Sequence, residues 1–416
     1  MTARATQHDP AGERRSGVLL HVTSLPGGRL GPEAHAVIDW LADAGQAWWQ
    51  VLPLTPPDAL GSPYASPSAF AGRADLLAAP DAPVGDDEIA AFRDRNAYWI
   101  DDWERVAGPG AVADQVRFDR EWGALRAHAA ARGVRILGDL PFYVAPGSAD
   151  AIAHPSLFRD DPVAGVPPDA FSDDGQLWGN PTYDWDAMRA DGFRWWIERL
   201  ARSAELHDGS RIDHFRAFDS WWAVPRDAPT AREGEWRPGP GADVIEAARA
   251  QLGPLSLVAE DLGIITDGVR DLLERLDLPG MRVLQFAFPG GDDNTHRPEH
   301  HPERCVVYVG THDNDTARGW WDTAGDDARR DATAAALHAG IDEERPERML
   351  MRLALSSRAR LAVLTAQDLL GLGSHARLNT PGTSDGNWSW RLRPGELTPE
   401  LAAWLRTETA RAGRLP

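Results

Sequence analysis

The sequence predicts an α/β fold, a (β/α)8 TIM barrel with subdomain insertions on the barrel loops. Two observations predict it. Eight short runs of almost continuously apolar residues are spread along the 416-residue chain, and helix-like segments lie between several of them. Such continuous hydrophobicity is typical of parallel strands that are covered on both faces, and eight of them alternating with helices indicate a barrel.

The elements follow in order along the chain. The expected strands are 17–25, 48–54, 134–144, 210–218, 255–263, 282–288, 305–315 and 361–370. The expected helices are 34–45, 120–133, 191–206, 267–277 and segments within 325–360. Two stretches, about 61–130 and about 145–190, are too long for simple connections and are predicted to be insertions. The proline- and glycine-rich stretch 225–243 is predicted to be a polar loop.

These elements divide the chain into three expected parts. They are a polar N-terminal tail (1–16), the barrel with its insertions (17–393) and a C-terminal helical segment (394–416). No run approaches the roughly 20 apolar residues of a membrane span, and the polar start lacks the apolar segment of a secretory signal. We therefore expect a cytoplasmic protein without a membrane partner.

Composition excludes several classes of function. The formal net charge of −20 argues against a nucleic-acid partner, because binding to phosphates depends on clustered basic residues. The chain contains no lysine, which excludes a Schiff-base enzyme and a phosphate-loop lysine. Cys305 is the single cysteine, so no internal disulfide is possible, and the flanking CVVYV indicates a buried strand thiol. Carboxylates, histidines, arginines and hydroxyls must supply any chemistry.

Charged residues gather where three of the expected strands end. They are Asp213 and His214 on the fourth strand, Glu260 and Asp261 on the fifth, and His312, Asp313 and Asp315 on the seventh. In barrel enzymes the active site lies at the carboxyl ends of the strands, so these residues are the first candidates for function. The alternative is a solvated rim, since loop ends are commonly polar.

Asp213 and Glu260 suit the two roles that cleavage of a glycosidic bond requires. One carboxylate must be ionised to attack, and the other must be protonated to release the leaving oxygen. Arg211 lies two positions before Asp213, on the same strand face, where its charge would keep that aspartate ionised. Glu260 follows the apolar LSLVA, which favours its protonated form. A structural ion pair between Arg211 and Asp213 is the alternative, and it would not exclude catalysis.

A metal site is not expected. The segment THDNDT (311–316) carries oxygen ligands at alternating positions, but it lacks the glycine and the distal glutamate of a calcium loop.

Seven motifs in order give the chain a resemblance to a known family. They are GSPYASPSAFAG (61–72), GDLPFYVAPGSAD (138–150), GVPPDAFSDDGQLWGNPTYDW (165–185), RIDHFRAF (211–218), VAEDLG (258–263), GTHDNDT (310–316) and LNTPGTSDGNWSWR (378–391). The chain resembles the 4-α-glucanotransferases called amylomaltases or disproportionating enzymes, glycoside hydrolase family 77. The region between 72 and 138 is shorter than the usual family pattern, which implies that part of the helical insertion is absent.

The resemblance implies roles for the strand-end residues. It makes Asp213 the nucleophile, Glu260 the general acid/base and Asp313 the carboxylate that stabilises the distorted sugar. Arg211 would position the nucleophile and His312 would bind sugar hydroxyls. A direct contact between His214 and sugar stays open.

A second set of residues is expected to bind the sugar. Tyr64 and Trp178 lie among loop formers, where an aromatic ring can pack on the apolar face of a sugar. The resemblance adds Gln176, Asn379 and Asn387 as hydrogen-bonding partners. For these three polar residues the alternative is stabilisation of a turn or loop.

The implied reaction is a retaining double displacement through a covalent glucosyl-aspartate. The expected partners are α-1,4-glucans such as maltotriose and longer maltodextrins as donors and acceptors, and glucose and maltose as acceptors, with no cofactor. Transfer in place of hydrolysis is implied by the resemblance alone. The alternatives are a retaining α-1,4-glucan hydrolase and a non-catalytic glucan-binding protein.

Overall fold

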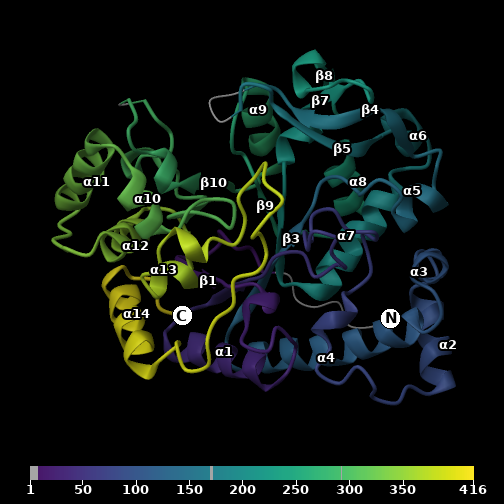
Figure 1. Ribbon diagram of the computed structural model, residues 1–416, viewed down its shortest axis with the longest axis horizontal. Helices are drawn as coiled ribbons and strands as arrows, with labels where there is room; N and C mark the ends of the chain where they lie inside the picture. Colours follow the sequence, from purple (N-terminus) through teal and green to yellow (C-terminus); the bar gives the residue numbers. More distant parts are fainter. Residues whose placement is uncertain (1–7, 169–171, 292) are drawn as a thin grey trace.

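A nearly closed barrel of parallel strands forms the centre of the molecule (Figure 1). The structure is a computed structural model that describes residues 8–168, 172–291 and 293–416. Residues 1–7 of the expected tail and 169–171 of the third motif therefore lie outside the described part. The barrel strands, in the order of the sheet, are β10 (Gly280–Val283), β11 (Cys305–Tyr308), β12 (Leu361–Thr365), β1 (Arg15–Leu19), β2 (Trp48–Gln50), β3 (Arg135–Leu140), β6 (Gly209–Ile212) and β9 (Leu257–Ala259).

A backbone hydrogen bond links the two edges of this sheet. The amide of Ala259 in β9 donates to the carbonyl oxygen of Pro279, which directly precedes β10, at 2.9 Å. The eight strands expected from the apolar runs are all present, so the barrel prediction is confirmed. Each strand is shorter than its apolar run, because the loops that follow the strands are buried too. Val22 and Leu25, for example, lie beyond the end of β1 and are completely buried.

Alternating side chains build two apolar layers, one inside the barrel and one between the barrel and its helices. In β11, Val306 and Tyr308 belong to the inner cluster, whereas Cys305 and Val307 pack in the outer one. This alternation follows from the two-residue period of a strand. Cys305 is thus the buried strand thiol that its neighbours indicate, and burial raises its pKa to about 12.

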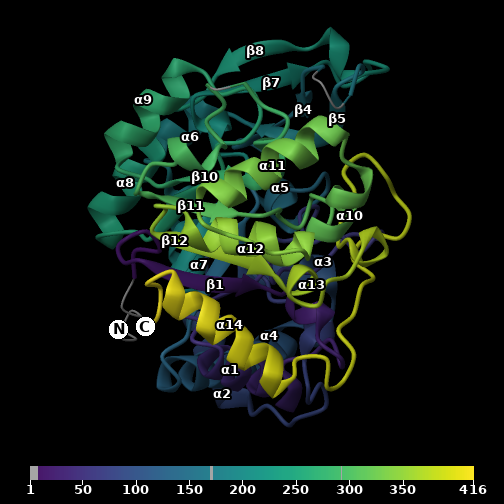
Figure 2. The same ribbon diagram turned by 90° about the vertical axis from the view of Figure 1, so that its left-hand side faces the viewer.

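Helices surround the barrel (Figure 2). Their bounds are α1 (Pro32–Asp43), α2 (Asp86–Arg95), α3 (Ile100–Ala107), α4 (Ala111–Ala131), α5 (Ala149–Ala153), α6 (Trp185–Ala190), α7 (Arg194–Leu206), α8 (Asp243–Leu252), α9 (Asp267–Leu276), α10 (Ala317–Thr323), α11 (Asp326–His338), α12 (Pro346–Ser356), α13 (Ala366–Leu369) and α14 (Pro399–Arg411). Gly340 and Pro346 separate α11 from α12 within the expected helical span 325–360. None of the described helices is long and apolar enough to cross a membrane.

A second, antiparallel sheet stands beside the barrel, at the upper right of Figure 1. Its order is β5 (Gln176–Tyr183), β4 (Phe158–Val166), β7 (Ser220–Val224) and β8 (Glu235–Pro238). The first two strands come from the segment after β3, and the last two from the segment after β6. The stretch 225–243, predicted to be a loop, contains β8. That prediction missed the strand because β8 is an edge strand whose four residues are all exposed, so it has no buried face.

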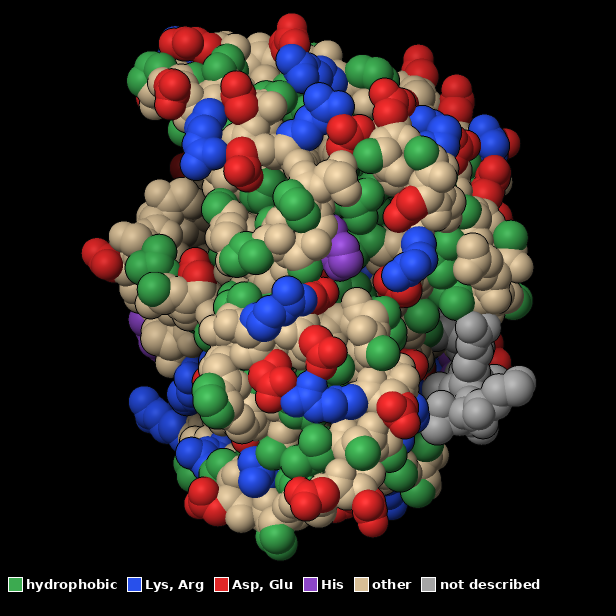
Figure 3. All heavy atoms as spheres, turned by 90° about the vertical axis from the view of Figure 1, so that its right-hand side faces the viewer, with side chains coloured by type: hydrophobic (Ala, Val, Ile, Leu, Met, Phe, Trp, Pro, Cys, Tyr) green, Lys and Arg blue, Asp and Glu red, His purple; other side chains and the backbone are tan. Residues whose placement is uncertain are grey.

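Acidic and basic side chains are interspersed over the face of the molecule that Figure 3 shows. Many exposed charges of the described residues pair locally, as Arg189 on α6 does with Asp243 on α8. Exposed pairs of this kind add little to stability. The candidate site at the mouth of the barrel combines buried charges, those of Arg211 and Asp139, with the partly exposed carboxylate of Asp213.

Candidate active site

The carboxyl ends of neighbouring barrel strands bring the candidate residues together. Asp213 directly follows β6, and its amide donates to the carbonyl oxygen of Leu140 at the end of β3. Glu260 directly follows β9, and its amide donates to the carbonyl oxygen of Ile212 in β6. The backbone ladder therefore continues past the strands and fixes both carboxylates at one edge of the sheet.

Arg211 is the centre of the site. Its Nη1 donates to both carboxylate oxygens of Asp139, at 2.8 and 2.7 Å, and its Nη2 donates to Oδ1 of Asp213 at 2.9 Å. The same Nη2 lies 3.9 Å from Oε2 of Glu260. The ion pair between Arg211 and Asp213, considered above as a structural alternative, is present and lies inside the site. The side chain of Asp213 is 27% exposed, so it can be reached from the mouth.

Arg211 also limits the separation of the two carboxylates. One nitrogen, Nη2, approaches an oxygen of Asp213 and an oxygen of Glu260. These two oxygens can be no farther apart than about 7 Å, which is compatible with the carboxyl separation of 5 to 5.5 Å in a retaining pair.

Glu260 is held by backbone amides in a buried setting. The amide of His214 donates to Oε2 at 2.7 Å and the amide of Leu262 donates to Oε1 at 3.1 Å. His214 adopts a left-handed conformation with φ of 47°, and it is the residue whose amide binds Glu260. Burial is the largest influence on Glu260 and raises its pKa to about 7, with Asp213 adding to the rise and Arg211 opposing it. Glu260 can therefore carry a proton near neutral pH.

The loop after β11 and the C-terminal loop meet at Asp313. The side-chain amide of Asn379 donates to Oδ1 of Asp313 at 2.6 Å, and Arg377 donates to the carbonyl oxygen of Asp313 at 3.0 Å. Nε2 of His312 lies 3.3 Å from the same Oδ1. Burial lowers the pKa of His312, so its ring is neutral at pH 7. Asn379 is thus a partner of an expected catalytic residue.

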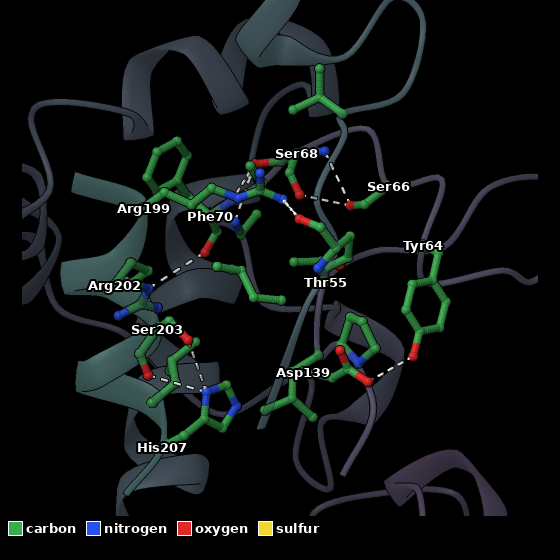
Figure 4. Close-up of a pocket in the computed structure, with 18 of the residues that line it drawn as sticks. Thr55, Tyr64, Ser66, Ser68, Phe70, Asp139, Arg199, Arg202, Ser203 and His207 are labelled. Atoms are coloured by element: carbon green, nitrogen blue, oxygen red, sulfur yellow. Dashed lines mark hydrogen bonds between the residues drawn. The ribbon is translucent and has the colours of Figure 1, made fainter. Parts of the chain in front are cut away.

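Tyr64 joins the two sides of the mouth. Its hydroxyl donates to Oδ2 of Asp139 at 2.8 Å (Figure 4), and its ring stacks on that of His312 with centroids 5.2 Å apart and planes inclined by 5°. Trp388 completes an aromatic group, 5.9 Å from Tyr64 and 6.0 Å from His312. Three aromatic rings therefore stand together beside the carboxylates, and a contact between Tyr64 and sugar stays a prediction.

A small cavity lies behind these rings, and Figure 4 shows its lining. It has a volume of about 40 Å³ and reaches from Tyr64 and Asp139 to Arg199, Arg202 and His207 on α7 and the segment that follows. A space of this size holds at most a few water molecules. The cavity is therefore too small for a sugar ring.

Gln176 and Trp178 lie on β5 at the other side of the mouth. The indole nitrogen of Trp178 donates to Oε1 of Gln176 at 3.1 Å, and its ring meets that of His214 edge-on at 4.8 Å. Burial lowers the pKa of His214 to about 3, so this ring is neutral. Asn387 accepts from the amide of Thr380 and donates to the carbonyl oxygen of Thr383. These bonds stabilise the loop that contains Asn387, which was the alternative to sugar binding considered for this residue.

Three residues of the site were not singled out from the sequence. Asp139, Arg377 and Trp388 contact Arg211, Asp313 and Tyr64 respectively. A signal existed for Asp139, since it is an aspartate in the apolar run VRILGDLPFYV. Arg377 and Trp388 carried no such signal.

No group of three or more His, Cys, Asp or Glu side chains that could hold a metal ion occurs among the described residues. The site is a set of carboxylates arranged around one arginine, with aromatic rings beside it. A (β/α)8 barrel with this mouth has the groups that an enzyme needs to cleave and form glycosidic bonds.

Comparisons with known proteins narrow this class. The profile of the family described as 4-alpha-glucanotransferase, glycoside hydrolase family 77, matches residues 20–90 and 111–398. The 4-alpha-glucanotransferase of Thermus thermophilus is 40% identical, over 97% of this chain and 99% of that protein. The chloroplastic/amyloplastic enzyme of Solanum tuberosum is 38% identical, over 98% of this chain and 88% of that protein. The amylomaltase of Streptococcus agalactiae in complex with acarbose superposes with a TM-score of 0.90 at 29% identity, covering 97% of this chain and 100% of that one.

The chain belongs to this 4-alpha-glucanotransferase family, and it is an enzyme of that type. The resemblance in the seven motifs is thereby confirmed.

The alignment with a relative is longer than this chain. The alignment with the Thermus thermophilus enzyme runs over 496 positions, which exceeds the 416 residues of this chain. The family profile also leaves out 91–110, which contains α3. The insertion expected at about 61–130 holds α2, α3 and most of α4, and α4 packs against α1 and β3 of the barrel as well as against α2 and α3.

Proposed function

We propose that this enzyme transfers α-1,4-glucan segments between maltodextrins by a retaining double displacement, with Asp213 as nucleophile and Glu260 as general acid/base. The observation that carries the proposal is the shared contact of Arg211. One guanidinium holds Asp213 and lies close to Glu260. Asp213 has this cation as its direct partner, whereas burial raises the pKa of Glu260 to about 7. Two carboxyl groups with opposed environments are what the reaction needs.

In the first half of the reaction, Asp213 attacks the anomeric carbon. Arg211 occupies Oδ1, so Oδ2 is the oxygen that forms the new bond. The bond between the anomeric carbon and the glycosidic oxygen breaks, and Glu260 donates its proton to that oxygen. A shorter glucan leaves, and a covalent glucosyl-aspartate remains.

In the second half, an acceptor glucan takes the place of the released chain. Glu260 removes the proton from the 4-hydroxyl of the acceptor as that oxygen attacks the anomeric carbon. The ester to Asp213 breaks, and its carboxylate returns to Arg211. Two inversions at one carbon retain the anomeric configuration.

Asp313 and His312 would bind the hydroxyls of the sugar at the cleavage point. Asn379 fixes one oxygen of Asp313, and stacking with Tyr64 fixes the ring of His312. Groups that are already oriented lower the cost of stabilising the distorted sugar in the transition state. Trp178 and Gln176, on the side of His214 and Glu260, would contact the leaving and accepting chains.

Incubation with maltotriose tests the proposal. Wild-type enzyme should form glucose and a ladder of longer maltodextrins while the number of reducing ends stays constant. Asp213→Ala should reduce the rate by at least about 10⁴-fold, the scale of loss for a nucleophile. Asp271→Ala, at an exposed aspartate on α9, is the matched control and should keep the wild-type rate.

Two other outcomes would contradict it. Reducing ends that rise without longer products would indicate a retaining hydrolase. Equal rates for wild type and Asp213→Ala would remove Asp213 from catalysis, and binding without turnover would indicate a glucan-binding protein.

A further inference from the structure

Trp388 has a backbone conformation that tryptophan seldom adopts. Its φ is 60°, in the left-handed region where a side chain crowds the following carbonyl group. In the described part of the chain, only four residues other than glycine have a positive φ, and two of them, Trp388 and His214, lie in the candidate site. Strain of this kind persists where the surrounding structure holds the residue in place, and it is concentrated at functional sites.

The C-terminal loop presents Trp388 to the mouth of the barrel. The amide of Trp388 donates to the carbonyl oxygen of Leu378 at 2.6 Å, and Leu378 is buried in the apolar layer inside the barrel. Between these two residues, Asn387 accepts from the amide of Thr380 and donates to the carbonyl oxygen of Thr383. The loop is therefore closed at its base, and this closure holds the backbone of Trp388 in its strained conformation.

Trp388 contacts two other loops of the mouth. Its ring lies 5.9 Å from that of Tyr64, on the loop after β2, and 6.0 Å from that of His312, on the loop after β11. A Cβ at Gly61 would lie 3.7 Å from the Cβ of Trp388, so the backbone of the first loop runs directly against this residue. Trp388 therefore joins three loops that come from distant parts of the chain.

Both ring neighbours of this tryptophan contact groups of the expected reaction. The hydroxyl of Tyr64 donates to Asp139, the partner of Arg211. Nε2 of His312 lies 3.3 Å from Oδ1 of Asp313. The hydroxyl of a tyrosine lies on the axis about which its ring turns, so this hydrogen bond leaves the plane of the ring free. Packing must fix that plane, and the plane of the histidine ring decides where its Nε2 points.

We infer that Trp388 is a positioning residue, which fixes the rings of Tyr64 and His312 and so orients the groups that bind the sugar at the cleavage point. This inference rests on the proposed function, because it assigns a further residue to the same reaction. Trp388 acts through its two neighbours and not by contact with the glucan. A misplacement of about 1 Å can lower a rate by about 100-fold, so the ring should matter more for kcat than for KM.

Two fluoride donors of different length provide the test, with maltose as the acceptor. α-Glucosyl fluoride fills only the site at the cleavage point, whereas α-maltotriosyl fluoride also reaches the sites of the next two sugars. Trp388→Gly removes the ring and introduces the residue that adopts a positive φ most readily. It should lower kcat for fluoride release by about tenfold or more, by the same factor for both donors, and change KM by less than about threefold.

A loss confined to α-maltotriosyl fluoride would overturn the inference, because it would make Trp388 a contact of a more distant sugar. A rise in KM at unchanged kcat would overturn it as well. Trp388→Phe keeps an aromatic ring and should recover most of the lost activity.

A double-mutant cycle with His312 shows whether Trp388 acts through that ring. In the His312→Ala background, Trp388→Gly should lower kcat by only about threefold or less, because a group that it positions is already absent. Equal factors in the two backgrounds would mean that the two residues act independently, and the inference would then be wrong.

Asp385→Gly is the matched control, because it places a glycine at an exposed position of the same loop. It should keep the wild-type kcat for both donors, and melting curves establish that each variant is folded. A loss in Asp385→Gly as large as that in Trp388→Gly would assign the effect to the flexibility of the loop and not to the ring.

Two results separate the inference from the function on which it rests. If the wild-type enzyme forms no transfer products from maltotriose or from either fluoride, the proposed function fails. If the wild-type enzyme transfers normally and Trp388→Gly keeps the wild-type kcat, only the inference fails.

Discussion

Two buried arginines lie at opposite ends of the barrel and are neutralised in different ways. Arg211, at the mouth, donates to the carboxylates of Asp139 and Asp213. Arg414, at the base, donates only to backbone carbonyl oxygens among the described residues. These acceptors belong to Leu355, Arg15, Arg360, Ser357 and Ala359. At the mouth, the charge of Arg211 is therefore stabilised by carboxylate charges. At the base, the charge of Arg414 is stabilised by the dipoles of backbone carbonyl groups.

The two environments move the pKa of these arginines in opposite directions. Burial lowers the pKa of Arg414 to about 9, and the charge of Arg14 adds to this effect. Burial opposes the charge of Arg211 as well, but Asp139 and Asp213 outweigh it and raise its pKa well above the usual value. The carbonyl groups around Arg414 do not titrate, so the charge at this end of the barrel does not change with pH. The carboxylates at the mouth can exchange protons and form covalent bonds.

Removing Arg211 should have the largest effect. Arg211→Met leaves Asp139 buried without its cation, and breaking a buried pair costs about 3 to 5 kcal/mol of unfolding free energy. Asp213 loses its orienting partner, so transfer should fall by about 10³-fold or more. Denaturant unfolding and fluoride release from α-maltotriosyl fluoride measure the two effects.

A second variant separates stability from catalysis. Arg211→Met combined with Asp139→Asn removes the unpaired carboxylate and should recover most of the lost stability, while activity stays low. Recovery of activity in this double variant would contradict the role of Arg211 in holding Asp213.

Removing Arg414 should affect stability alone. Arg414→Met leaves buried carbonyl oxygens at the starts of β1 and β12 without this donor and should cost about 3 kcal/mol of unfolding free energy. The residue lies far from the carboxyl ends of the strands, so kcat per folded molecule should equal that of wild type. Arg411→Met, at an exposed arginine on α14 that pairs with Glu408, is the matched control and should cost less than about 1 kcal/mol. A lower kcat for Arg414→Met would show that the base is coupled to the mouth.

A contrast between single residues and contacts between strands explains what the sequence could predict. The barrel strands are buried on both faces, so each is recognisable from its own residues. Asp213, Glu260 and Asp313 interrupt or end such runs and were found one by one. Asp139 interrupts such a run as well, but its part in the site depends on register: β3 lies beside β6 and places Asp139 opposite Arg211.

The second sheet shows the same limit more strongly. Its strands come from two separate segments of the chain, and β8 has no buried face. The pairing of Trp236 with Trp222 became known only with the register of the strands. The local sequence pattern therefore predicts a strand whose own residues are apolar enough to be buried. It does not predict a strand that forms only because it pairs with a segment distant in the sequence.

The last expected effect is a dependence of kcat/KM on pH that arises from Glu260 at the mouth. Glu260 must be protonated to assist the leaving oxygen, and burial raises its pKa to about 7. Above about pH 7, kcat/KM for maltotriose should therefore fall about tenfold per pH unit. A donor whose leaving group needs no proton, such as α-maltotriosyl fluoride, should show no such fall in its first burst of fluoride.

The same shift predicts the pH dependence of stability, measured by denaturant unfolding between pH 5 and pH 8. The folded-state pKa of Glu260 lies above its unfolded value, so the folded state binds the additional proton. The stability this contributes is complete below the unfolded pKa and is lost as pH rises through about 7. Glu260→Gln, which cannot titrate, should therefore gain stability relative to wild type as pH rises, by about 1.4 kcal/mol per unit between pH 5 and 7. Arg414→Met should differ from wild type by the same amount at every pH in this range. A constant difference for Glu260→Gln as well would mean that Glu260 is ionised in the folded enzyme and is not the proton donor.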